Sequence, residues 1–266
     1  MATTPSRARA SALPGFSVLL DKELLEARRS KRMLVFLLAM TACLVLVATV
    51  GYLRIEHFGA AGRHQVSGNG MDTMLGSWTA LVGFLGSLMV IASTVDAMSR
   101  ERSLGISAWI VTKPVSRLSY LGAKAVAHSL IAIAMLVALP TAIWLAMMLA
   151  LFQDVPLGRI AVAALILCVE MGFLSFFIVA LGVPFRSVPP IAMIGLGVWF
   201  LPNFVPAIES LRWSYHLLPS YLPLAALSVA VADDTRAFMY TVPLASIGIA
   251  AALFAAAVVM FERQEL

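Results

Sequence analysis

One carboxyl group stands alone in the apolar part of this sequence. Glu170 lies near the middle of the apolar run 160–183, a depth at which a charged side chain costs at least ~2.5–3.5 kcal/mol. No Lys, Arg or His is expected at the same depth of another run, so an ion pair is not expected. Glu170 is therefore expected either to line a hydrated transport path or to be a neutral carboxyl that hydrogen-bonds Thr41, Thr79 or Thr141.

The sequence lacks the motifs of the common hydrolytic and nucleotide chemistries. It has no G-x-x-x-x-G-K-[ST] and no Gly-Lys dipeptide at all, and it has no H-E-x-x-H or G-x-S-x-G. Asp233 and Asp234 are adjacent acids without further ligands, which is typical of a solvated turn. Cys43 and Cys168 lie in apolar runs, where they are expected to pack. We therefore expect no catalytic residue, metal site or cofactor in this chain.

The chemistry-bearing residues must be positioned by membrane helices. Apolar residues make up 61% of the 266 residues and charged residues only 12%, against roughly 25% charged in a soluble domain. Each apolar run reaches the roughly 20 residues that a membrane helix needs. The predicted fold class is an all-α integral membrane protein with six transmembrane helices, near residues 33–53, 73–97, 125–151, 160–183, 188–208 and 241–261.

The positions of Lys and Arg predict the orientation of these spans. With the N-terminus inside, 14 of the 19 Lys and Arg fall in cytoplasmic segments and 5 in outer segments. Basic residues favour the cytoplasmic side, so both termini are expected there. The net charge of +5 is thus explained by topology, and no basic stripe with interleaved aromatics indicates a nucleic-acid partner.

The segment before the first span is expected to divide in two. Residues 1–15 are predicted to be a disordered cytoplasmic tail, and residues 16–266 a single transmembrane domain. In residues 16–32, apolar side chains recur every three or four positions, which predicts an amphipathic helix on the inner membrane surface. The alternative is a merely basic flank that anchors the first span.

The stretch from Arg100 to Lys124 is too apolar for a solvated connector. Five apolar side chains fall within residues 104–111, and charges bracket them on both sides. Ser103 can cap a short helix and Pro114 should end it. Such a helix must bury its apolar face, either against the membrane surface or against a partner protein.

This stretch resembles the permease subunit of type-2 ABC exporters. The residues that carry the resemblance are Glu101, Gly105, the run Pro114-Val115-Ser116-Arg117, and Gly122-Ala123-Lys124. The segment DKELLEARRSKR is similar to the family's surface elbow helix, and the ending FERQEL is similar to its cytoplasmic close. The resemblance covers the whole chain in length and topology.

The resemblance implies a division of labour between two kinds of subunit. A separate ATPase binds ATP and Mg, and the cytoplasmic loop docks into it as a coupling helix. It also implies a second copy of the permease or a paralogue, and a bacterial-type plasma (inner) membrane whose lipid surrounds the spans. The residues that would contact the ATPase are Arg100, Glu101, Arg102, Leu104, Gly105, Trp109, Lys113, Pro114 and Arg117.

Two other functions stay open at this point. A polytopic membrane enzyme would need catalytic groups within the spans, where only Glu170 is available. A non-transporting anchor or sensor would keep the ATPase contact without moving a substrate. We favour the exporter permease, in which Glu170 is the candidate residue of the translocation path.

Overall fold

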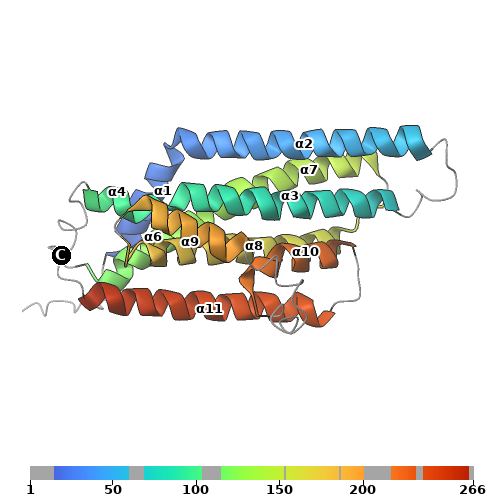
Figure 1. Ribbon diagram of the computed structural model, residues 1–266. Helices are drawn as coiled ribbons and strands as arrows, with labels where there is room; N and C mark the ends of the chain where they lie inside the picture. The colour runs from blue at the N-terminus through green and yellow to red at the C-terminus, as the bar shows by residue number, and fades with distance from the viewer. Residues whose placement is uncertain are drawn as a thin grey trace, which may run out of the picture.

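The computed structural model describes residues 15–59, 69–103, 115–152, 154–185, 187–200, 217–231 and 236–263. Within these ranges the chain is helical and contains no strand. The long helices run side by side along one bundle (Figure 1). In chain order the elements are α1 (Phe16–Arg28), α2 (Lys31–Gly59), α3 (Asn69–Thr94), α4 (Ala97–Ser103), α6 (Arg117–Ala132), η1 (Ile133–Ala138), α7 (Leu139–Leu151), α8 (Leu157–Leu181), α9 (Val188–Phe200), η4 (Pro219–Tyr221), α10 (Leu222–Val231) and α11 (Arg236–Arg263).

Five stretches of the described chain are long and apolar enough to cross a membrane. They match the first four predicted spans and the last one, and they are Lys31–Leu53, Gly70–Glu101, Arg117–Leu151, Leu157–Leu181 and Tyr240–Arg263. A helix satisfies its own backbone hydrogen bonds, which lipid cannot do, so apolar runs of this length fold as helices. The predicted all-helical membrane fold is confirmed at this level.

The predicted span 188–208 differs from the other five. Its described part is α9, whose 13 residues extend only ~20 Å, less than the roughly 30 Å of hydrocarbon. Residues 201–208 lie outside the described residues. A crossing at this place therefore stays a prediction.

The third span changes its helical winding at its centre. Between α6 and α7, the segment η1 is a π-helix that ends just before Pro140. Proline has no N–H to donate, and its ring clashes with the carbonyl four residues earlier. A wider turn moves that carbonyl away, so the helix continues through the proline.

The centre of the bundle is α8, which packs against α3, α6, α10 and α11. It buries many of its residues, including Leu167, Met171 and Leu174, although Leu165 is exposed. Beside it, the indoles of Trp78 and Trp144 stack with ring centroids 5.1 Å apart. A helix that is apolar on every side is expected in such a core position.

Residues 209–240 connect the last two predicted spans. The structure has η4 and α10 in this segment, and α10 packs against α3 and α8. Pro223 of α10 lies so close to Gly83 of α3 that a Cβ on the glycine would approach it to 2.7 Å. The helix α10 is thus part of the bundle and does not merely rest on its surface.

Candidate functional site

Of the nine residues expected to contact a partner, the structure describes the side chains of three, namely Arg100, Glu101 and Arg117. Arg102 lies in α4 with its side chain outside the described set, and Leu104, Gly105, Trp109, Lys113 and Pro114 lie outside the described residues. The expected coupling helix therefore lies outside the described residues. The residues on its two sides are described, and they meet in one charged site at the end of the bundle.

Glu101 forms the centre of this site. It ends the second candidate span, and its side chain is only 9% exposed. Lys22 Nζ of α1 donates to Glu101 Oε1 at 2.5 Å, and Lys124 Nζ of α6 lies 3.2 Å from Oε2. The hydroxyl of Tyr120 also donates to Oε2. A buried carboxylate is tolerated when each oxygen is paired in this way.

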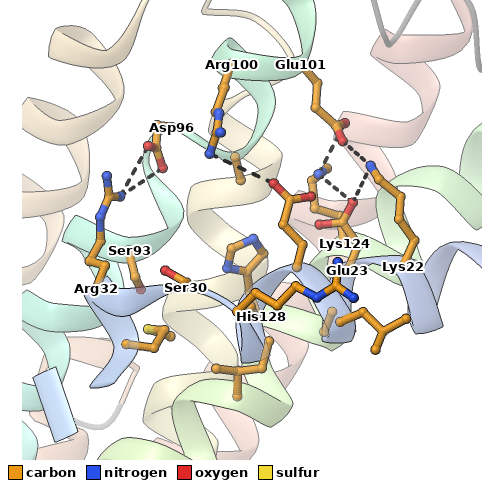
Figure 2. Close-up of a pocket in the computed structure, with 18 residues that line it drawn as sticks. Lys22, Glu23, Ser30, Arg32, Ser93, Asp96, Arg100, Glu101, Lys124 and His128 are labelled. Carbon is orange, nitrogen blue, oxygen red and sulfur yellow. Dashed lines mark hydrogen bonds and ion pairs between the residues drawn. The ribbon is translucent and has the colours of Figure 1, made fainter. Parts of the chain in front are cut away.

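Lys124 links the same carboxylate to α1. Its side chain is 3% exposed, and Nζ donates to Glu23 Oε1 at 3.0 Å. Lys22 also contacts Glu23 Oε1, at 3.3 Å. We call Lys22, Glu23, Glu101, Tyr120 and Lys124 the charge cluster; it joins α1, α4 and α6. Figure 2 shows its four charged members.

The protonation state of Lys22 follows from its surroundings. Partial burial acts to lower the pKa of this ammonium group, but hydrogen bonds and charge from Glu101 and Glu23 outweigh burial. The pKa of Lys22 is therefore raised above its ordinary value. Lys22 carries its proton at neutral pH.

Sequence reasoning missed most of the charge cluster. It gave no role to Lys22 or Glu23 and treated Lys124 only as part of a family pattern. One signal was available, since Glu23 falls three residues after Leu20 and four before Ala27, on the apolar face of the helix. A charge within an apolar face indicates a buried partner of opposite sign.

Arg117 is not a member of the charge cluster but contacts Phe261 of α11, whose ring also stacks on Tyr120 of the cluster. Its guanidinium donates to the backbone carbonyl of Phe261 and lies 5.5 Å from the centre of that ring. The residue before it, Ser116, caps α6 by accepting the Ser119 N–H at 3.0 Å. Arg117 thus ties the start of α6 to the end of α11.

The start of α1 touches the same region. Gly15 has φ 80°, and a Cβ there would lie 2.9 Å from Cγ2 of Val115. Val115 belongs to the Pro-Val-Ser-Arg run. The segment before the first span and the residues flanking the loop between the second and third spans are therefore in contact at two places, here and in the charge cluster.

A second group of charges lies beside the cluster. Arg32 Nη1 is 3.2 Å from Asp96 Oδ2, and Arg100 Nη1 is 3.9 Å from Glu26 Oε1. Both pairs are partly exposed. Together with the charge cluster they surround a cavity of about 700 Å³ (Figure 2).

Glu170 lies far along the bundle and does not line this cavity. It is 2% exposed, and Ser87 donates to its Oε1 at 2.5 Å. Trp199 of α9 is a second polar neighbour of this carboxyl group. The two neighbours belong to α3 and α9.

The expectation that Glu170 hydrogen-bonds a threonine is wrong. Thr79 donates to its own helix at Leu75 O, and Thr141 accepts from Trp78 Nε1 at 3.1 Å. Thr41 Oγ1 is buried without a partner among the described residues. The packing of α3 on α8 brings Ser87 nearest, which span boundaries alone do not reveal.

The chain matches a known family of membrane proteins. A family model described as an ABC-2 family transporter protein matches residues 19–208, from within α1 to beyond α9. The chain belongs to the ABC-2 transporter family. As an ABC-2 permease it is a multi-pass membrane protein and a membrane component of an ABC transporter. The family generally works with an ATPase subunit, and the matched residues contain the whole charge cluster. No curated protein matches the chain.

Proposed function

We propose that this ABC-2 permease is the membrane subunit of an ATP-driven exporter, and that a separate ATPase docks on residues 100–117. The observation that carries the proposal is the charge cluster. It connects α4, which leads into the loop, with α6, which leaves it, and with α1. A force applied to the loop would reach three helices at once.

The burial of the charge cluster explains how it would transmit motion. Separating Lys124 from its carboxylates would leave buried charges without partners, at a cost of about 3–5 kcal/mol. The ends of α1, α4 and α6 should therefore move as one body when the ATPase dimer closes. Arg117 would extend this body to the end of α11.

The arrangement of helix ends supports six crossings with both termini in the cytoplasm. Val183 after α8 packs with Tyr120 of α6 and Phe261 of α11, so these three ends lie together. The start of α11 lies at the opposite end of the bundle (Figure 1). Between α8 and α11 the chain must cross once more, and α9 with the residues after it would make that crossing. With the basic residues inside, the charge cluster faces the cytoplasm.

The proposal is tested by co-purification. The chain is expressed with its neighbouring genes, purified in mild detergent, and the bound proteins are identified. We expect a nucleotide-binding ATPase, in an assembly of two permease and two ATPase subunits. Trp109→Ala with Lys113→Ala should remove it, while Arg212→Ala with Trp213→Ala, a matched change in the predicted outer segment, should not.

Two results would contradict the proposal. One is a folded wild-type chain that recovers no ATPase. The other is an ATPase that stays bound to the loop variant or is lost equally from the outer variant. Glu101 is unsuitable for this test because its burial in the charge cluster makes its replacement a perturbation of the fold.

A further inference from the structure

A cavity lies beside the charge cluster. It measures about 700 Å³ and lies between α1, the first turn of α2, the end of the second span and α6. Figure 2 shows Arg32 and Asp96 on one side, Glu101, Lys22 and Lys124 on the other, and His128 between them. Nδ1 of His128 is buried and has no hydrogen-bond partner among the described residues.

The charges around the cavity leave an excess of positive charge. Its lining contains five Lys or Arg and four Asp or Glu. Each of the four carboxylates already pairs with a basic side chain. Arg29 is the fifth basic residue; it is exposed and takes part in none of the ion pairs of the described residues.

Arg32 also keeps unused donors. Its contacts with Asp96 and with the carbonyl of Ala92 all use Nη1. A guanidinium has five N–H donors in a planar fork, so Nη2 and Nε remain for a further acceptor. Arg29 and Arg32 both lie near the junction of α1 and α2.

The lining also contains apolar side chains, and they lie near the predicted start of the first span. Leu25, Met33 and Ile131 contribute to the wall, and Leu25 is 54% exposed. Met33 is also the first residue of the first predicted apolar run. A ligand here would meet basic groups at one end and hydrocarbon at the other.

We propose that this cavity binds the phosphate headgroup of an anionic phospholipid of the inner leaflet. Arg29 and Arg32 would hold the phosphate oxygens through charge-assisted hydrogen bonds. Leu25 and Met33 would contact the first carbons of the acyl chains. The proposal rests on the orientation inferred from the basic residues, and it does not depend on the ATPase.

The test measures lipid binding by the full chain, purified in detergent and stripped of lipid. Phosphatidylglycerol, diacylglycerol and inorganic phosphate are added in separate titrations, and the shift of the thermal unfolding midpoint is followed. Phosphatidylglycerol should give a saturable rise that the other two do not give. In Arg29→Gln with Arg32→Gln, half-saturation should need about tenfold more phosphatidylglycerol or the rise should be lost.

Arg28→Gln with Lys31→Gln is the matched control, because it removes two charges from the same segment that do not line the cavity. It should bind phosphatidylglycerol like the wild type. If both double variants lose the response to phosphatidylglycerol equally, or both keep it, Arg29 and Arg32 are not the binding site. An equal shift with inorganic phosphate would overturn the lipid as its ligand. Arg29→Gln alone is a second variant that should fold normally, because Arg29 is exposed. Its unfolding midpoint without lipid should equal that of the wild type, and its response to phosphatidylglycerol should be weaker.

Discussion

Lys124 is the residue whose replacement tests the charge cluster most directly. Lys124→Met keeps an unbranched side chain of similar length and removes the ammonium group that lies 3.0 Å from Glu23 Oε1 and 3.2 Å from Glu101 Oε2. Two buried carboxylates then share the ammonium of Lys22, which is 40% exposed. Removal of one partner from a buried pair typically costs about 3–5 kcal/mol, and we expect a loss in this range.

The magnitude is measured by equilibrium unfolding of the purified chain in detergent micelles. Arg32→Gln is the comparison, because it breaks a pair whose side chains are 50% and 31% exposed. Exposed pairs contribute up to about 1 kcal/mol, so its effect should be several times smaller. Retained helix content in both variants shows that unfolding is compared from the same state.

The second half of this experiment is a double-mutant cycle with Glu23→Gln. If Lys124 and Glu23 interact as the structure shows, Lys124→Met should cost less in the Glu23→Gln background than in the wild type. A coupling of about 0.5–3 kcal/mol is expected for residues in direct contact. Additive effects, or a cost for Lys124→Met as small as that for Arg32→Gln, would refute the assignment of a buried cluster.

Three further predictions concern other parts of the fold. Gly15→Ala should destabilise the chain by about 1–2 kcal/mol in thermal unfolding, because φ is 80° and the new Cβ would meet Val115; a smaller effect contradicts the contact. Glu170→Gln should shift stability by less than about 1 kcal/mol because an amide can still accept from Ser87, whereas Glu170→Leu should cost about 1–3 kcal/mol in the same assay; equal costs contradict this pairing. Arg117→Gln should raise the rate of amide hydrogen exchange in the last turn of α11, and an unchanged rate contradicts the contact of Arg117 with Phe261.

Several predictions from the sequence were correct for a simple physical reason. Five of the six apolar runs appear as helices of spanning length, because length and apolarity are properties of contiguous residues. The family resemblance rested on short motifs within residues 101–124, which lie inside the stretch 19–208 that the family model matches. Local composition and local motifs were sufficient for both.

Predictions that needed contacts between helices were incomplete or wrong. The partner of Glu170 was sought among threonines, and the structure gives Ser87. No partner within the chain was predicted for Arg117, and the structure places it on Phe261 of α11. Each case depends on the rotation and height of one helix relative to another.

The sequence alone determined the helical membrane fold, the resemblance to ABC-2 permeases and the expected side of each charge. The fold and the expected side of each charge follow from the cost of placing charge and unpaired backbone groups in lipid, which acts on each segment separately, and the resemblance rests on short contiguous motifs. Only the tertiary structure decided that Lys22 meets Glu101 and that Lys124 meets Glu23, pairs separated by 79 and 101 residues along the chain. A hydrogen bond requires its atoms within about 3 Å, and at such separations only the packing of α1, α4 and α6 sets that distance.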